Sequence, residues 1–511
     1  MSSRKKNALS GALASTGGSV VLQLVSLLVI PLYLDLTSQE LFGLWLTLGA
    51  LLGWIKIGDM GLGLALTRRS IEAIEDNNYG LLCRLTYGVI FLTFIFGVFI
   101  SGLGYFFTDT IMSAFEISVN LENDFKKTYY LLLVAALIRP CFGVFSSLIE
   151  AKQYLAFLHT KNTLVTLSTI AFTVVLLFLE FGIVSFAYGL LFEALIMPVI
   201  DIIYLRIIDN KILFLPIRTS KKDLISLLKF GGPFQLLKVA NLVATSTDNI
   251  IIASILGASS VTIYVFTGKL AFLFAVFLGS VVPTILFSGF TQLFALGDKN
   301  KLGRLYFKLS DLAIRLGLFS SILYFFINEL FVDLWVGIEN YGGFDLTIIF
   351  VIWIIFESFI RGITSIILAS SDLNGITIVS SLEAVSNILL TVIFIQSLGL
   401  FGVVLGTVLS RLITVVYIPL KINKMLNINN MKYFKRLGFN LVIYSTPMLL
   451  VGSLINSYMD ETIMPIIQII IIGSAILFVN IASYEGVFIM RKKGISWKGR
   501  IRLLKEFYYS V

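Results

Sequence analysis

The sequence contains little charge for its length. Lysine, arginine, aspartate and glutamate make up 14% of its 511 residues, whereas 57% of the residues are hydrophobic. A soluble domain carries about 25% charged residues, so this chain lacks the polar side chains that would cover its apolar mass in water. A water-soluble globular protein is therefore excluded, and burial in a lipid bilayer is indicated.

Residues that carry metal or nucleophilic chemistry are also scarce. The two cysteines, Cys83 and Cys141, are far apart, and the only histidine is His159. Neither a disulfide nor a metal site is supported, and a Ser-His-Asp set is not expected around a histidine at a loop end. The sequence contains no Asp-x-Asp pair and no G-x-x-x-x-G-K loop. It therefore gives no support for metal-assisted nucleotide chemistry or for ATP hydrolysis, and no cofactor is expected.

Long apolar segments are what the sequence has in abundance. They are about 20 residues long, which is the length of helix that crosses ~30 Å of hydrocarbon, and they lack the short alternation of barrel strands. The sequence thus predicts an all-α integral membrane protein with about fourteen transmembrane helices. The predicted helices span residues 11–34, 40–67, 85–107, 128–149, 159–179, 182–206, 228–256, 261–294, 305–328, 345–370, 375–396, 399–421, 437–457 and 463–490.

The first apolar run has the basic flank of a signal peptide. Arg4, Lys5 and Lys6 precede the segment from Gly17 to Leu34. That segment is as long as a spanning helix, and no small-residue cleavage site follows it. We therefore expect a retained first helix.

Charged loop residues differ between the two sides of the predicted helices. Basic residues gather on one side, among them Arg68, Arg69, Lys152, Lys161, Lys221, Lys222, Lys299 and Lys301. Acidic residues predominate on the other side, among them Asp35, Glu40, Asp109, Glu329 and Asp333. The positive-inside rule places both termini in the cytoplasm and requires an even number of helices. Membrane orientation therefore accounts for the net charge of +9, and no nucleic-acid partner is expected.

The two halves of the chain look related. Gly43-Leu-Trp45 and Gly58 correspond to Tyr264-Val-Phe266 and Gly279, about 220 positions later. An even number of helices per half predicts a parallel repeat. We predict an N-terminal six-helix lobe (1–210), a C-terminal six-helix lobe (211–425), and two extra helices with a basic cytoplasmic tail (426–511). Residues 497–508 of this tail are either a basic amphipathic helix on the inner leaflet or a frayed end.

Several polar and charged side chains fall inside the predicted helices. A Lys, Arg or Asp at a helix centre costs about 2.5–3.5 kcal/mol on insertion scales and needs a partner or a wet cavity. The candidates for contact with a substrate are Lys56, Arg139, Lys238, Asn241, Lys269 and Arg361. The candidates for ion coupling are Asp59, Glu193 and Asp248. Bases at membrane depth attract anions, and phosphate is the commonest anionic group on lipid-anchored substrates.

Ion pairs are the alternative explanation for many of these charges. Pairs within one helix are available to Lys56 with Asp59, Glu357 with Arg361, and Asp311 with Arg315. Arg139, Lys238 and Lys269 have no opposite charge one turn away, so they need partners on other helices or water. The isolated acids Glu193, Glu383 and Glu485 fit either a proton or sodium site or an interhelical hydrogen bond.

Four short motifs carry a resemblance to a known family. They are Pro31-Leu-Tyr33, Phe42-Gly-Leu-Trp45, Ile57-Gly-Asp-Met-Gly-Leu-Gly63 and Phe230-Gly-Gly-Pro233. With the two lobes and the extra helix pair, they resemble the polysaccharide-transport branch of the multidrug/oligosaccharidyl-lipid/polysaccharide exporter superfamily. The resemblance implies a V-shaped pair of bundles around a central cavity. The implied activity is the flipping of an undecaprenyl-diphosphate-linked oligosaccharide, a repeat unit of O-antigen, capsule or exopolysaccharide, to the outer leaflet of the bacterial inner membrane.

The resemblance also implies binding partners, and it leaves alternative functions to be weighed. The partners are the lipid-linked anionic oligosaccharide and membrane lipids, with a polysaccharide polymerase and a chain-length regulator as candidate proteins. The main alternative is a cation-coupled drug or metabolite exporter of the same superfamily, which the acids Asp59 and Glu193 support. A membrane enzyme, such as a polysaccharide polymerase, is disfavoured because the longest predicted outer loop, from Phe107 to Lys127, is short. Coupling to the membrane potential and antiport of a proton or sodium ion both stay open.

Overall fold

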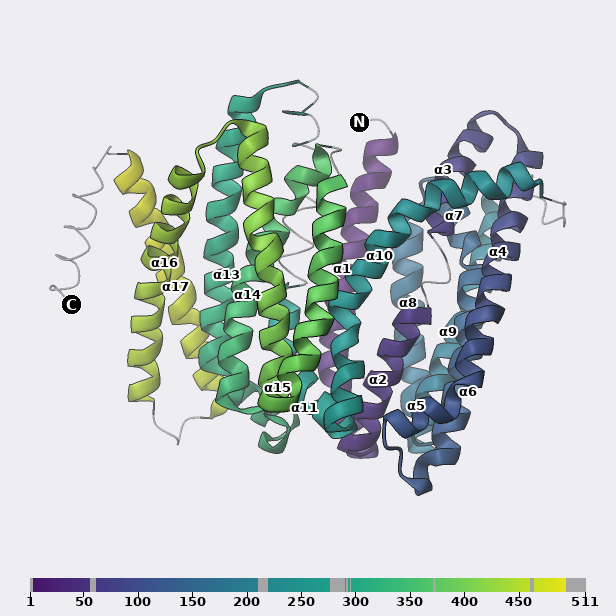
Figure 1. Ribbon diagram of the computed structural model, residues 1–511, viewed down its shortest axis with the longest axis horizontal. Helices are drawn as coiled ribbons and strands as arrows, with labels where there is room; N and C mark the ends of the chain where they lie inside the picture. The colour runs from purple at the N-terminus through teal and green to yellow at the C-terminus, as the bar shows by residue number, and fades with distance from the viewer. Residues whose placement is uncertain are drawn as a thin grey trace. The chain divides into compact units, whose positions relative to one another are not determined.

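Helices make up all of the regular secondary structure in the described part of the chain. The computed structural model describes residues 3–55, 61–209, 219–275, 290, 293–294, 296–370, 374–459 and 464–492. The elements in chain order (Figure 1) are α1 Ser3–Leu36, α2 Gln39–Ile55, α3 Leu62–Glu75, α4 Tyr79–Phe106, α5 Thr108–Ala114, η2 Val119–Leu121, α6 Glu122–Phe142, α7 Val144–Ala151, α8 Leu155–Phe178, α9 Val184–Ile208, α10 Lys221–Leu256, α11 Ala258–Thr267, α13 Lys299–Val336, η3 Ile338–Asn340, α14 Gly343–Ala369, α15 Asn374–Leu426, α16 Asn430–Tyr458 and α17 Pro465–Lys492. The predicted all-α membrane class is confirmed.

Many of these helices are suited to cross a bilayer. Nine described helices are long and apolar enough, and ten if the pair Ala258–Thr267 and Lys269–Ala275, bent by 54°, is one span. Each predicted helical segment overlaps at least one described helix, although the predicted segment 40–67 overlaps two of them, α2 and the beginning of α3. Gly399, with φ 56° and ψ −139°, interrupts α15 at the first residue of the predicted segment 399–421. A positive φ costs glycine little because it has no Cβ.

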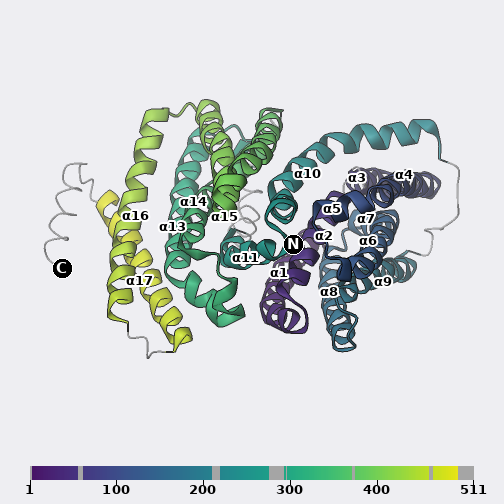
Figure 2. The same ribbon diagram turned by 60° about the horizontal axis from the view of Figure 1, so that its bottom comes forward.

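The described chain forms two compact units. The first unit comprises Met1–Val265 and Gly375–Ser410, and the second comprises Phe266–Asn374 and Arg411–Val511. Within the first unit α1 packs beside α8, and α10 packs against α2, α3 and α4 (Figure 2). Within the second unit α13 packs against α14, α16 and α17. The lobes with boundaries at 210 and 425 stay a prediction.

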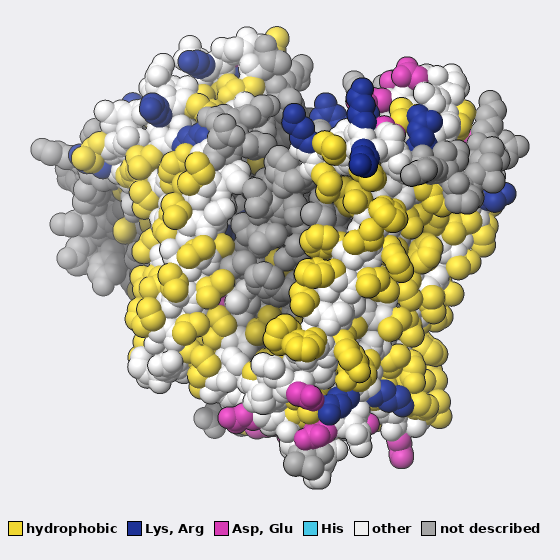
Figure 3. Space-filling view, turned by 45° about the vertical axis from the view of Figure 1, so that its right-hand side comes forward, with side chains coloured by type: hydrophobic (Ala, Val, Ile, Leu, Met, Phe, Trp, Pro, Cys, Tyr) yellow, Lys and Arg dark blue, Asp and Glu magenta, His cyan; other side chains and the backbone are white. Residues whose placement is uncertain are grey.

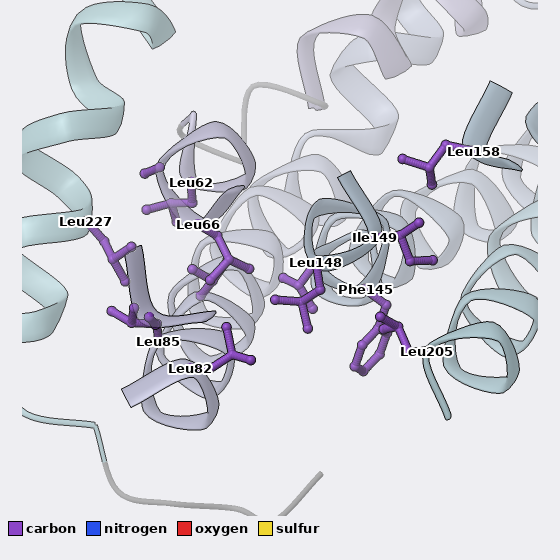
Figure 4. Close-up of a cluster of buried hydrophobic side chains, with 14 residues drawn as sticks. Leu62, Leu66, Leu82, Leu85, Phe145, Leu148, Ile149, Leu158, Leu205 and Leu227 are labelled. Carbon is purple, nitrogen blue, oxygen red and sulfur yellow. The ribbon is translucent and has the colours of Figure 1, made fainter. Parts of the chain in front are cut away.

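A cluster of buried aliphatic side chains holds part of the first unit together. Leu62 and Leu66 of α3 meet Leu82 and Leu85 of α4 and Leu148 of α7 (Figure 4). All five are at most 1% exposed. Lipid tails are as apolar as leucine, so this packing stabilises the unit chiefly through close van der Waals contact.

Small residues let some helices approach closely. A Cβ on Gly18 of α1 would lie 2.2 Å from the Thr163 hydroxyl oxygen of α8, and a Cβ on Gly43 of α2 would lie 1.9 Å from the carbonyl oxygen of Ala258. Backbones of membrane helices approach in this way where one side chain is missing. Gly43 of the Phe42-Gly-Leu-Trp45 motif is therefore a packing residue.

The surface separates apolar from charged side chains. On the face shown in Figure 3, hydrophobic side chains cover the length of the helices, and most lysine and arginine side chains lie at one end of them. This distribution fits a membrane-spanning protein. The cytoplasmic placement of both termini stays a prediction, and the tail residues 497–508 lie outside the described residues.

Candidate functional site

Not all of the predicted site residues lie in the described part of the chain. Lys56 and Asp59 fall outside it. Lys238 and Asn241 lie on α10, but their side chains are outside the description. The positions of Arg139, Glu193, Asp248, Lys269 and Arg361 are described. Only Arg139 and Glu193 form a pair among these predicted residues.

Arg139 of α6 and Glu193 of α9 form an ion pair between helices. Arg139 Nη2 donates to Glu193 Oε1 at 2.9 Å. The Glu193 side chain is 7% exposed and the Arg139 side chain 44%. Arg139 lies in the last turn of α6, directly before Pro140, and near the middle of the apolar stretch Glu122–Ala151 that α6 and α7 form together. The expected partner on another helix is confirmed.

Glu357 lies near the middle of α14 and accepts hydrogen bonds from two arginines. Arg361, one turn later on the same helix, donates Nε–H to Oε1, which confirms the pair predicted from the sequence. Arg411 of α15 donates Nη2–H to Oε2. The Glu357 side chain is 3% exposed, whereas those of Arg361 and Arg411 are 38% and 18% exposed.

Lys269 follows the bend at the end of α11. Its Nζ lies 6.0 Å from the centre of the Trp335 ring of α13, in a cation–π contact. Trp335 also stacks with Phe331 and meets Phe266 edge-on. An aromatic face attracts an ammonium group, by about 2 kcal/mol where water is excluded. The expected contact with another helix is therefore made through a ring.

Asp248 of α10 belongs to a buried cluster of oxygen atoms in the first unit. Its Oδ2 accepts from the Tyr264 hydroxyl at 3.1 Å and from the Thr407 hydroxyl at 3.4 Å. The Thr407 oxygen accepts from Asn387 Nδ2 at 2.9 Å. Asp248 Oδ1 and Asn387 Oδ1 are buried and have no hydrogen-bond partner among the described residues. A buried oxygen atom without a hydrogen-bond partner costs free energy, and binding of a proton or a hard cation would remove that cost.

Lys161 and Asp201 form a buried ion pair that was not predicted from the sequence. Lys161 was predicted at the cytoplasmic end of the helix 159–179, and α8 begins at Leu155, six residues before the lysine. Its Nζ lies 2.6 Å from Asp201 Oδ1 on α9, and Ser146 of α7 donates to Asp201 Oδ2 at 2.5 Å. The lysine and aspartate side chains are 3% and 1% exposed. An acid inside the predicted helix 182–206 was the available signal for this pair.

Exposure separates two kinds of buried ion pair. In the Lys161–Asp201 pair both side chains are buried, which is typical of an ion pair that holds two helices together. At Glu193 and Glu357 the acid is buried, while Arg139 and Arg361 keep 44% and 38% of the side chain exposed. Within spanning helices, the charge left accessible at these two places is therefore positive. Such a charge suits an anionic ligand.

Comparison with known sequences identifies one family. A family model described as "Polysaccharide biosynthesis protein" matches residues 42–341, which is more than half of the chain. This range includes Arg139, Glu193, Asp248 and Lys269. No curated protein sequence matches the chain significantly.

Solved structures of three transporters share the fold. The lipid II flippase MurJ in an inward closed conformation is 17% identical, with a TM-score of 0.69 over 94% of this chain and 99% of that chain. An inward-facing multidrug resistance MATE family transporter of the MOP superfamily is 16% identical, with a TM-score of 0.65 over 84% and 95%. A MOP superfamily transporter from Pyrococcus furiosus, described with a binding pocket of reverse polarity, is 16% identical, with a TM-score of 0.57 over 83% and 96%. These similarities concern the fold.

Proposed function

Because the chain belongs to the polysaccharide biosynthesis protein family, in the polysaccharide branch of the multidrug/oligosaccharidyl-lipid/polysaccharide exporter superfamily, we propose that it flips an undecaprenyl-diphosphate-linked oligosaccharide. The substrate, a repeat unit of O-antigen, capsule or exopolysaccharide, moves from the cytoplasmic to the outer leaflet of the bacterial inner membrane. The chain is a multi-pass membrane protein with the fold of known transporters. The flippase has both termini in the cytoplasm.

The observation that carries this proposal is the accessible arginine beside a buried acid. Arg139 keeps 44% of its side chain exposed although its partner Glu193 is buried. An arginine near the middle of a spanning helix is costly in hydrocarbon, so the exposed part faces water or a polar ligand. A guanidinium group matches phosphate oxygens in charge and in bidentate geometry. A diphosphate that carries a sugar provides these oxygens at the end of a lipid chain.

Transport then proceeds by alternating access. The diphosphate and sugars pass along a wet path inside the protein while the lipid chain stays in the bilayer. Arg139, Lys238, Asn241, Lys269 and Arg361 contribute to this path, together with Lys56. These residues bind the substrate and take part in no catalytic step. A polysaccharide polymerase and a chain-length regulator are the proposed protein partners, because they act on the product at the outer leaflet.

Asp248 is the best-supported candidate for the residue that couples transport to a cation. The carboxylate, Thr407 and Asn387 bring buried oxygens together, and two of these oxygens have no hydrogen-bond partner among the described residues. A proton or sodium ion bound there stabilises one conformation of the protein relative to another. Asp59 is a further candidate for this role. Glu193 is less suited because it is already neutralised by Arg139.

The second candidate function is a cation-coupled drug or metabolite exporter. The fold of the multidrug resistance transporter and the buried acid Asp248 favour it. An exporter of hydrophobic cations is expected to present accessible acids, whereas Glu193 and Glu357 are buried behind arginines. The accessible charge therefore favours the anionic lipid.

Neutral substitutions in cells test the proposed function. Arg139→Gln, Lys238→Gln and Lys269→Gln are each expected to lower surface polysaccharide at matched protein levels, because each removes a positive charge from the path. Lys301→Gln is the control, since Lys301 is 62% exposed beside Asp298 at the start of α13. Normal polysaccharide in all three variants would overturn the proposal.

A further inference from the structure

We propose that Trp45 and the open space beside Gly49 form a sugar-binding subsite on α2, where a neutral pyranose ring of the lipid-linked substrate stacks on the indole. This subsite rests on the proposed function and serves the sugar part of the substrate, which carries no charge for the basic residues to attract. Trp45 ends the Phe42-Gly-Leu-Trp45 motif. The tight packing of Gly43 explains the glycine of that motif but not its tryptophan.

A cluster of aromatic side chains holds the Trp45 ring. Trp45 stacks on Phe186 of α9, with ring centroids 4.7 Å apart and an interplanar angle of 15°. Phe186 is 4% exposed, and Tyr33 of α1 meets it edge-on at 5.0 Å. Side chains from two of the four family motifs, Tyr33 and Trp45, therefore meet at one buried ring. Phe186 fixes the plane of the indole, and a ring oriented in advance binds a ligand at a low cost in entropy.

Gly49 lies one turn after Trp45, beside open space. Residues four apart share a helix face, so Trp45 and Gly49 point the same way. Gly49 is exposed, and a Cβ at this position would meet nothing within 4 Å. One further turn along, a Cβ on Gly53 would lie 3.1 Å from Leu242 of α10. The open space is therefore bounded by the indole at one end and by α10 at the other, over about 12 Å of helix.

Protein, and not lipid, surrounds this part of α2. The helix packs against α1, α4, α6 and α10 (Figure 2). Among the side chains of α2 that the structure describes, no large hydrophobic one is exposed. On α4, by contrast, Phe91 and Phe99 are 55% and 60% exposed, as expected for side chains in contact with lipid. The exposure at Gly49 therefore belongs to a space that protein lines.

The chemistry of this space fits a sugar ring. A pyranose has a face of C–H groups and an edge of hydroxyl groups. Its apolar face matches the free face of an indole, and the indole N–H is a donor for a hydroxyl at the edge. The small residue at Gly49 leaves room for the thickness of the ring. An uncharged aromatic surface of this kind recognises shape and apolar contact, so it distinguishes a lipid with a sugar from a lipid without one.

Three substitutions remove different parts of the subsite. Gly49→Leu fills the open space, and its Cβ makes no contact within 4 Å, so the fold should survive. Trp45→Leu keeps an apolar side chain and removes the ring, whereas Trp45→Phe retains an aromatic face. Gly102→Leu is the control for filling, because Gly102 of α4 is also exposed with nothing within 4 Å of its Cβ. Phe157→Leu is the control for stacking, because Phe157 stacks on Tyr204 at the other end of the unit.

The experiment measures binding by the purified full-length protein, after thermal unfolding has shown that each variant is folded. The probes are undecaprenyl diphosphate that carries one neutral N-acetylhexosamine, and the same lipid diphosphate without a sugar. Loss of one aromatic contact predicts that Trp45→Leu raises the Kd of the sugar-bearing lipid by about threefold to tenfold. Gly49→Leu should raise it similarly, and Trp45→Phe should recover part of the affinity. The Kd of the sugar-free lipid should be unchanged in all three variants, and both controls should bind both lipids like the wild type.

The ratio of the two dissociation constants decides the outcome. If Trp45→Leu and Gly49→Leu bind the sugar-bearing lipid as well as the wild type does, the subsite is refuted. It is also refuted if both variants lose the two lipids equally, because the space then serves the lipid chain or the fold. In either case a wild type that flips the sugar-bearing lipid leaves the proposed function standing. A wild type that neither binds nor flips this lipid contradicts the proposed function itself.

Discussion

Arg139 and Glu193 are joined by a 2.9 Å ion pair in which the acid is buried and the base is not. The arginine is oriented by the Glu193 carboxylate, and its exposed part is free to contact a ligand. The stability of the protein should depend mainly on the ion pair, and transport of an anion should depend on the exposed part of the arginine. Substitutions at the two positions should separate these effects.

The first prediction concerns this pair. Arg139→Gln leaves the buried Glu193 carboxylate without its partner and should lower the free energy of unfolding by about 1–3 kcal/mol. The double variant Arg139→Gln with Glu193→Gln should recover most of that stability, because two amides hydrogen-bond without charge. Surface polysaccharide should stay low in both variants. Normal polysaccharide in the double variant would show that Arg139 serves the fold and not the substrate.

The second prediction concerns the Lys161–Asp201 pair. Both side chains are almost fully buried, so Asp201→Ala strands a buried ammonium group and should cost about 3–5 kcal/mol of stability. Lys161→Met with Asp201→Leu should unfold at nearly the wild-type temperature. Polysaccharide per folded molecule should be normal in the double variant. A folded double variant without transport would give this pair a functional role.

The third prediction concerns cation coupling at Asp248. Asp248→Asn removes the carboxylate that Tyr264 and Thr407 contact and should abolish any dependence of the flipping rate on sodium or on a pH gradient. Thr407→Val removes one oxygen of the cluster and should weaken that dependence. The measurement is the initial flipping rate in vesicles at several sodium concentrations and pH gradients. An unchanged dependence in Asp248→Asn would exclude this residue from coupling.

The fourth prediction compares two glycines of α2. Gly43→Ala would place a Cβ 1.9 Å from the Ala258 carbonyl oxygen, whereas Gly49→Ala would meet nothing within 4 Å. Overpacking should make Gly43→Ala about 1–3 kcal/mol less stable. Gly49→Ala should be neutral or up to about 1 kcal/mol more stable, because alanine is the better helix former. Thermal unfolding of both variants checks this, and equal stability would contradict the tight contact at Gly43.

The sequence was most informative where the signal is local. A membrane-spanning helix can be predicted from its own apolar residues, and each predicted segment therefore overlaps a described helix. The Glu357–Arg361 pair was also predictable, because residues four apart share a helix face. Two other ion pairs could not be predicted in this way, because they depend on how separate helices pack. They are the pair of Arg411 with Glu357 and the pair of Lys161 with Asp201. The periodicity of a single segment does not show which residues of other helices it will contact.

A flipping assay in vesicles tests the central claim most directly. The purified protein is reconstituted, and movement of a labelled undecaprenyl-diphosphate-linked sugar between leaflets is measured. We expect the wild type to accelerate this movement well above protein-free vesicles, Arg139→Gln to lose most of the acceleration, and Lys301→Gln to retain it. Wild-type protein that leaves this lipid unmoved, but transports a hydrophobic cation without need of Arg139, would contradict the account.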